Sequence, residues 1–164
     1  MIKMLGALLV SLAIAGCASR QPVPEGYVGP TAIVGDSVNT ADPSKPQVFA
    51  LMRINGEGID NTFVASARAS SGKGFQLTTR MEIRKVFAKP MKATIRGSHI
   101  TAAPIQQIMR SVAGTFYSVE GVVDFSPQPD KVYAVRGELK PEGSAVWIED
   151  VETNQRVTEK IVSK

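Results

Sequence analysis

The stretch that decides the fold is residues 117–125, which read Tyr-Ser-Val-Glu-Gly-Val-Val-Asp-Phe. Its odd-numbered side chains are apolar or small and its even-numbered ones are mostly polar, which is the period-two pattern of a half-buried β-strand. Residues 126–130, Ser-Pro-Gln-Pro-Asp, have the composition of a loop. The alternation then resumes over residues 133–139, with Tyr133 and Val135 on the apolar face. These two runs predict strands with one face on a core and the other in water.

The same pattern recurs on both sides of these two strands. Further strands are expected at residues 48–54, 62–69, 75–83, 91–96, 145–149 and 156–162. The tripeptide Ala88-Lys89-Pro90 lies between two of the runs and reads as their hairpin connection, because proline cannot donate to a strand ladder. Only residues 101–112 break the rhythm, and they predict a short helix that crosses between two groups of strands.

This pattern predicts an all-β fold. About eight or nine short strands with frequent Gly and Pro turns are typical of an antiparallel β-sandwich, and we expect an immunoglobulin-like or transthyretin-like arrangement with one short helical crossover. The β-sandwich domain is assigned to residues 31–164.

The N-terminus differs in composition from the rest of the chain. Lys3 gives it a positive start, and the apolar run from Met4 to Ala15 has the length of a signal-peptide core but is too short to cross a bilayer as a helix. Residues 1–16 are therefore expected to be a signal peptide. Residues 17–30 carry several prolines and glycines, which is typical of a tether.

The signal peptide ends in Ile14-Ala15-Gly16-Cys17. This tetrapeptide resembles the lipobox of bacterial lipoproteins that are processed by signal peptidase II, and small all-β envelope lipoproteins offer a looser likeness. The resemblance implies that Ile14, Ala15 and Gly16 are read by the peptidase. It also implies that Cys17 carries a diacylglycerol on its sulfur and an acyl chain on its nitrogen. These groups would anchor the protein firmly, since two or more acyl chains give stable membrane attachment.

By the same resemblance, Ala18 after the cysteine points to the outer membrane, with the domain facing the periplasm. Cys17 is the only cysteine, so no intramolecular disulfide can form and the core alone must hold the fold. The alternatives are an ordinary cleaved signal peptide that leaves Cys17 as a free thiol, and a buried N-terminal helix.

The charge is unevenly spread. The formal net charge is +4, and residues 45–110 hold eleven basic against three acidic residues, whereas residues 111–164 hold six against nine. Such asymmetry can mark an anionic partner. For a lipidated envelope protein we expect anionic glycans, lipid headgroups or acidic protein surfaces, and no nucleic acid.

One candidate binding face follows from the predicted hairpin. It would place Arg80, Arg84, Lys92 and Arg96 on the same side, where cations on facing strands lie close enough to repel one another. A sequence that accepts this cost can offer the four cations to an anionic partner. The alternative is a solvated face that Glu82 and other acidic residues relieve.

No catalytic or metal-binding motif stands out. His99 is the only histidine, which excludes a site built from several histidines. Trp147 is expected to be a packing residue, with a sugar-binding platform as the alternative. Glu149, Asp150 and Glu152 lack the spacing of a calcium loop and are expected to form a solvated turn. We therefore expect no enzyme activity, no metal and no cofactor beyond the acyl groups.

Three functions remain compatible with the sequence. The first is a non-catalytic interaction or assembly domain for another envelope component. The second is a lipoprotein that binds an anionic glycan or lipopolysaccharide. The third is a proteinaceous inhibitor of a cell-wall hydrolase.

Overall fold

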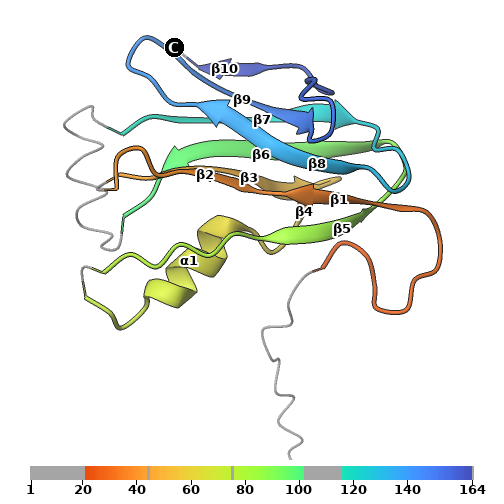
Figure 1. Ribbon diagram of the computed structural model, residues 1–164, viewed down its shortest axis with the longest axis horizontal. Coiled ribbons are helices and arrows are strands. Elements are labelled where there is room, and N and C mark those ends of the chain that lie inside the picture. The colour runs from red at the N-terminus through yellow and green to blue at the C-terminus, as the bar shows by residue number, and fades with distance from the viewer. Residues whose placement is uncertain (1–20, 44, 75, 102–115, 164) are drawn as a thin grey trace, which may run out of the picture.

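A computed structural model describes residues 21–43, 45–74, 76–101 and 116–163. They form a β-sandwich of two five-stranded sheets with one helix beside them (Figure 1), so the all-β sandwich prediction is confirmed. The elements are β1 (Thr31–Gly35), β2 (Ser37–Asn39), β3 (Gln47–Ile54), β4 (Glu57–Gly58), α1 (Thr62–Ser70), β5 (Ile83–Phe87), β6 (Met91–His99), β7 (Ser118–Phe125), β8 (Val132–Glu138), β9 (Ser144–Asp150) and β10 (Ile161–Ser163).

The first sheet, here sheet A, has the order β10-β9-β8-β1-β5, and sheet B has the order β2-β3-β6-β7 with β4 on β3. All neighbouring strands run antiparallel except β1 and β8, which are parallel. The chain passes from sheet A to sheet B at Asp36, the single residue between β1 and β2. Asp36 is buried at this corner.

The core lies between the sheets and follows the predicted alternation. In β7, Val119, Val123 and Phe125 are buried while the residues between them are exposed or half-buried. The Phe125 ring meets the Tyr133 ring edge to face, with centroids 5.1 Å apart. The strands predicted at 91–96, 117–125, 133–139 and 145–149 are thus confirmed with their apolar faces inward.

Phe49 fills the centre of the core only because glycines face it. A Cβ atom built on Gly137 would lie 2.5 Å from the Phe49 ring and 2.4 Å from the Ala145 carbonyl oxygen, and one on Gly97 would lie 2.8 Å from the same ring. All three distances are shorter than a Cβ atom can approach its neighbours, so the two glycines make room for the aromatic side chain.

The two sides of the sandwich are closed differently. On one side β10 lies against β7, where Ser163 Oγ donates to the Ser118 carbonyl at 3.0 Å and Ile161 covers Gly121. On the other side sheet A ends at β5, and α1 lies next to the segment that leads into β5 (Figure 1) and contacts β3 of sheet B.

The strand predicted at residues 62–69 is wrong, because these residues form α1. Asn61 caps the helix by accepting the Val64 N–H at 3.2 Å. The buried face of α1 consists of Thr62, Ser66 and Ser70 rather than apolar residues. The helix therefore lacks the apolar stripe by which amphipathic helices are found in a sequence.

The predicted hairpin of residues 75–83 and 91–96 is also wrong. β5 begins only at Ile83 and pairs with β1, whereas β6 pairs with β3 and β7. Residues 88–90 therefore connect the two sheets instead of turning one strand onto the next. The helix predicted at residues 101–112 falls almost wholly outside the described residues. The final strand is shorter than expected: β10 covers Ile161–Ser163, and Arg156 forms an isolated bridge with Glu149.

Residues 21–30 pack on the domain. The Tyr27 ring stands edge to face with Phe87 at 5.0 Å between centroids, and the Pro30 carbonyl accepts the Ala88 N–H at 3.1 Å. The chain thus contacts the sandwich well before β1 begins.

Candidate functional site

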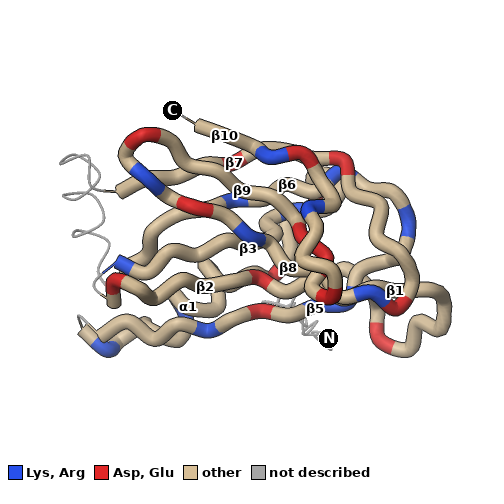
Figure 2. The backbone as a smooth tube through the Cα atoms, turned by 45° about the horizontal axis from the view of Figure 1, so that its top comes forward, with Lys and Arg blue, Asp and Glu red and all other residues tan. Residues whose placement is uncertain are grey.

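The structure does not bring the four cations of the predicted basic face together. Arg84 points into the interior, where its side chain is 1% exposed. Lys92 and Arg96 lie in β6 and are paired across the ladder with Asp124 at 2.7 Å and Glu120 at 3.8 Å. Arg80 is exposed in the segment that leads to β5. Figure 2 shows acidic residues interspersed with the basic ones over the described chain.

Arg84 instead forms a buried ion pair with Asp36. Its Nη2 lies 2.7 Å from Asp36 Oδ2, and the Asp36 side chain is fully buried. The remaining contacts of the guanidinium are long, at 3.5 Å to the Leu51 carbonyl and 3.4 Å to the Glu82 carbonyl. Its Nε has no partner among the described residues.

The Asp36 carboxylate also binds two backbone amides. Oδ1 accepts the Leu51 N–H at 3.0 Å and Oδ2 accepts the Thr62 N–H at 2.8 Å. The first contact holds β3 next to its bulge, and the second places a negative charge at the N-terminus of α1, where the helix dipole favours it. One carboxylate therefore joins the corner between the sheets to β3, β5 and α1.

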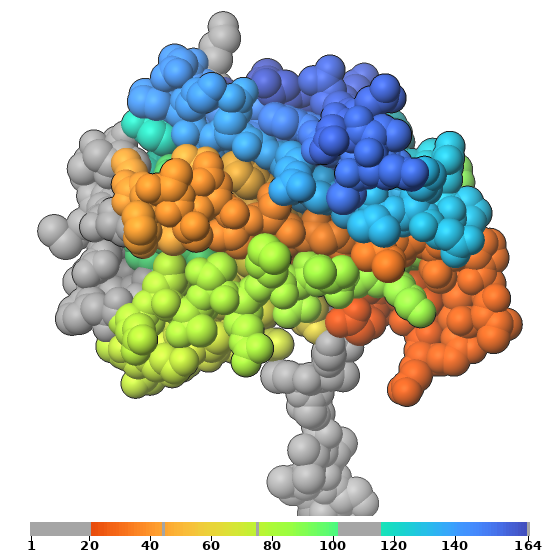
Figure 3. Space-filling view, viewed as in Figure 1, coloured from red at the N-terminus to blue at the C-terminus, as the bar shows by residue number. Residues whose placement is uncertain are grey.

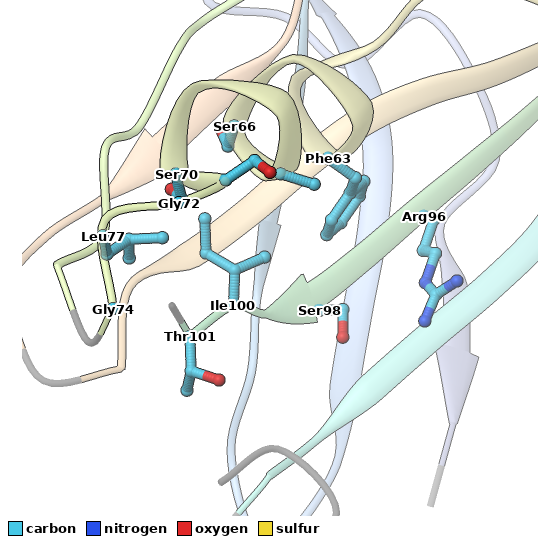
Figure 4. A pocket seen from close by; sticks show the side chains of 12 residues that line it. Phe63, Ser66, Ser70, Gly72, Gly74, Leu77, Arg96, Ser98, Ile100 and Thr101 are labelled. Atoms are coloured by element: carbon cyan, nitrogen blue, oxygen red, sulfur yellow. The ribbon is translucent and has the colours of Figure 1, made fainter. Parts of the chain in front are cut away.

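A cleft of about 660 Å³ lies between α1 and the outer face of sheet B. Its floor is apolar: Phe63 and Ala67 come from the helix, and Leu77 and Ile100 from flanking segments. Figure 4 shows Phe63, Leu77 and Ile100 pointing into the hollow under the helix. Its remaining lining consists of serine, threonine and glycine residues and one arginine, namely Ser66, Ser70, Ser71, Gly72, Gly74, Ser98, Thr101 and Arg96.

Arg96 is the one cation that lines this cleft within the described part of the chain. Its guanidinium lies 5.4 Å from the centroid of the Phe63 ring, within the range of a cation–π contact. Its pairing with Glu120 is loose at 3.8 Å, and both side chains are partly exposed. The cleft thus combines an aromatic ring, hydroxyl groups and an accessible guanidinium.

A second candidate site is the outer face of sheet A. Apolar side chains gather there around Gly35, and we call them the outer-sheet patch: Ile33, Met81, Ile83, Val132 and Val151. Met81, Ile83 and Val132 are 57%, 65% and 43% exposed. In Figure 3 the green segment that ends in β5 runs along the orange β1 on this face.

The cross-strand register explains why these side chains meet. Ile33 lies opposite Val132 in β8, and Gly35 lies opposite Ile83 in β5. Since alternate residues of a strand point to the same face, these residues share the outer side of the sheet. Gly35 leaves a hollow between them because it has no side chain.

His99 is buried at the end of β6, not in a loop. Its Nδ1 lies 3.0 Å from the Lys45 carbonyl oxygen, and its ring packs against Phe116 and Tyr117. Burial lowers the pKa of His99 below its ordinary value, because the charged imidazolium loses its hydration. Its Nε2 has no hydrogen-bond partner among the described residues. His99 is therefore a packed side chain whose burial favours the neutral form of the ring.

The acidic residues after β9 are held by local contacts. The Asp150 carboxylate accepts the N–H groups of Glu152 and Thr153 at 2.9 and 3.0 Å, and these bonds lower the pKa of Asp150. Glu152 pairs with Lys131, while Glu149 accepts the Trp147 indole N–H at 3.3 Å. Trp147 is half-buried, and Lys160 Nζ lies 5.1 Å from the centroid of its ring. Over the described ranges no cluster of three or more His, Cys, Asp or Glu side chains could hold a metal ion.

Cys17 and the residues Ile14, Ala15 and Gly16 before it lie outside the described residues. In the part of the chain that is described, no helix is long and apolar enough to span a bilayer.

Sequence reasoning missed the residues that organise these sites. Asp36 gave no signal as a lone acid between two short strands. Phe63 lies in residues 62–69, where the sequence predicts a strand, and the alternation of residues 75–83 predicts Met81 and Ile83 on an apolar, core-facing side.

Comparison with known proteins gives no relative: no family model, no curated protein and no solved structure matches this chain.

Proposed function

We propose that this chain is an outer-membrane lipoprotein whose β-sandwich is a non-catalytic interaction module in the periplasm. The lipobox supports the anchor, and the outer-sheet patch supports the docking role. Exposed apolar side chains that lie scattered are ordinary, but a contiguous group on one face is typical of an interaction site. The observation that carries the proposal is the exposure of Met81 and Ile83 next to Val132.

The anchor would hold the domain close to the membrane. The first residue with a ring contact on the sandwich is Tyr27, which packs on Phe87. Cys17 is ten residues before Tyr27, and such a stretch spans at most about 36 Å when fully extended. A lipidated Cys17 therefore restricts the domain to partners that lie at or near the membrane surface.

The test is capture of membrane components by the full-length chain in the envelope that contains it. The wild type is compared with a Met81→Asp/Ile83→Asp variant and with Val122→Asp, which changes a side chain that is 58% exposed on the opposite sheet. All three should fold, since substitutions at exposed sites away from special features usually change stability by about 0.5 kcal/mol or less.

We expect a protein partner that the wild type and Val122→Asp retain and the double variant loses. Retention in 1 M salt would agree with an apolar contact, because only exposed charge contacts are strongly screened there. A partner bound equally by all three chains would contradict the proposal.

A second candidate function is supported by the α1 cleft. A guanidinium over an aromatic ring, with hydroxyl groups around it, suits a glycan that carries a carboxylate or phosphate. Titration with a uronic-acid oligosaccharide tests this alternative. Arg96→Gln should abolish binding, and Arg136→Gln, which changes an exposed arginine of sheet A, should leave it intact.

A further inference from the structure

Three hydroxyl groups of α1 take the place of a neighbouring strand. Thr62 Oγ1, Ser66 Oγ and Ser70 Oγ accept the N–H groups of Glu82, Arg80 and Thr78, each at 2.9 Å. The two serine hydroxyls also lie within 3.5 Å of the carbonyl oxygens of Arg80 and Thr78.

We call these three N–H to hydroxyl bonds the hydroxyl ladder. The spacing of residues along the helix and along the extended chain makes the ladder possible. Residues four apart on a helix are separated by about 6 Å along its axis, and residues two apart on a strand by about 6.8 Å. Hydroxyls at every fourth helical position therefore reach alternate residues of an extended chain. Residues 78–82 are held extended in this way without belonging to either sheet.

The ladder fixes which way the backbone groups of this segment point. Asp36 N–H donates to the Glu82 carbonyl, and Ala88 N–H donates to Pro30, so the even-numbered groups face β1 or α1. Ile33 N–H donates to Lys131 beside β8, which leaves the even residues of β1 to bond β5. The N–H and carbonyl groups of residues 79, 81, 83 and 85 consequently face the opposite edge, where sheet A ends and no described strand pairs with them.

This edge has a distinctive set of neighbours. Met81 and Ile83 expose apolar side chains beside it, and Lys85 is an exposed cation on the same face. A hollow of about 640 Å³ separates the edge at Ile83–Lys85 from the N-terminal residues 21–27. Lysine on an edge strand usually prevents indiscriminate pairing. Lys85 would also select among incoming strands, because an acidic residue placed beside it would neutralise its charge.

We propose that the edge formed by residues 79–85, here the docking edge, binds an extended segment of a partner protein as an additional strand of sheet A. The segment would place apolar residues beside Met81 and Ile83 and an acidic residue beside Lys85. Backbone hydrogen bonds supply affinity in such strand addition, and alternate side chains supply specificity. This inference rests on the proposed interaction function and names the form and chemistry of the partner.

The probe is a synthetic peptide, Thr-Glu-Thr-Val-Thr-Val-Thr, which in antiparallel pairing sets Glu beside Lys85 and Val beside Ile83 and Met81. Controls are the same peptide with Lys for Glu and one with Pro for its central Val. Binding is measured by fluorescence anisotropy with the full-length chain in detergent.

The matched variants are Lys85→Pro and Lys85→Ala. Both lose the charge, but only the proline removes the outward N–H, for which the described residues offer no backbone partner. We expect equal melting temperatures and about tenfold weaker peptide binding by the proline variant, the loss expected for one interfacial hydrogen bond. If Lys85→Pro melts lower, Met81→Pro against Met81→Ala gives the same comparison, because both lose the methionine side chain and only the proline loses the N–H that faces the peptide.

Amide exchange gives an independent readout. On binding, the amides of residues 81, 83 and 85 should become protected, while those of residues 82, 84 and 86 are already protected in the free chain. Equal binding by the proline and alanine variants, or no new protection at the odd-numbered amides, would overturn the inference. Equal affinity for the Glu and Lys peptides would overturn its acidic preference.

The two proposals fail separately. If the Met81→Asp/Ile83→Asp variant loses the captured partner and Lys85→Pro retains it, the interaction module stands and strand addition falls. If both variants bind the captured partner as well as the wild type does, the role of the outer-sheet patch in binding is refuted.

Discussion

The buried pair of Asp36 and Arg84 predicts an unequal response to loss of either partner. Removing one member of a buried ion pair commonly costs about 3–5 kcal/mol, because the other charge is left without compensation. The two residues differ in what remains to them. Without Arg84, the Asp36 carboxylate still accepts the Leu51 and Thr62 N–H groups at 3.0 and 2.8 Å.

Arg84 has no comparable support. Without Asp36, its buried guanidinium has two carbonyl contacts of 3.4 and 3.5 Å and an unpartnered Nε. Asp36→Asn also turns one acceptor into a donor that faces a backbone N–H, which adds about 1–3 kcal/mol for an unsatisfied buried group. We expect Asp36→Asn to destabilise the fold by about 5 kcal/mol and Arg84→Met by about 3 kcal/mol, toward the two ends of the range.

Urea unfolding of the two variants and the wild type measures the difference directly. A typical domain is stable by about 5–15 kcal/mol, so Asp36→Asn can abolish folding while Arg84→Met remains folded. The double variant Asp36→Asn/Arg84→Met should be more stable than Asp36→Asn alone, because no buried charge is left unpaired and the asparagine oxygen still accepts one backbone N–H. Equal losses for the two single variants, or a larger loss for Arg84→Met, would refute the assignment of Asp36 as the central residue of this network.

Three further predictions concern other parts of the sandwich. Because burial lowers the pKa of His99, the unfolded chain binds the proton more tightly than the folded chain does. The contribution of His99 to stability is therefore complete above pH 6.5 and falls as the pH drops below that value. His99→Phe should flatten the dependence of the melting temperature on pH between about pH 7 and 5. Ser66→Ala leaves the Arg80 N–H without its acceptor, so we expect the free energy of unfolding to fall by about 1–3 kcal/mol and the Arg80 amide to exchange rapidly. Unchanged exchange would contradict the hydroxyl ladder. Gly137→Ala should cost about 1–3 kcal/mol or more by overpacking Phe49, and Phe49→Leu in the same chain should recover part of that loss in chemical denaturation.

The strands that the sequence predicts correctly are those whose apolar side chains face the core and whose polar side chains face water. In residues 117–125 and 133–139 the apolar face packs on the core and the polar face meets water, so the pattern and the structure agree. Residues 75–83 show an equally clear alternation, yet Met81 and Ile83 point to solvent and Arg84 points inward. A shift of one residue exchanges the two faces of a strand, and the alternation alone does not say which face is buried in the core.

The candidate sites depended on contacts between distant segments, which no local pattern records. The predicted basic face needed a hairpin that does not form, so its cations separated onto different elements. The ion pair joins Arg84 of β5 to Asp36 at the corner between the two sheets, and its partner amides come from β3 and α1. The outer-sheet patch likewise draws on β1, β5 and β8 together.

The local pattern fails in two segments, residues 62–70 and residues 78–84, and these segments are joined to each other by the hydroxyl ladder. Residues 62–70 bury hydroxyls where a packing helix would bury apolar groups, and residues 78–84 expose apolar groups where a strand would bury them. A sandwich closed on both sides would need neither arrangement, and β10 on β7 shows how this chain closes the other side with an ordinary apolar contact. Sequences that depart from local consistency usually do so at functional sites. The hydroxyl ladder and the buried pair hold one extended segment open along its outer edge, which is the reason to look for a partner strand at this edge first.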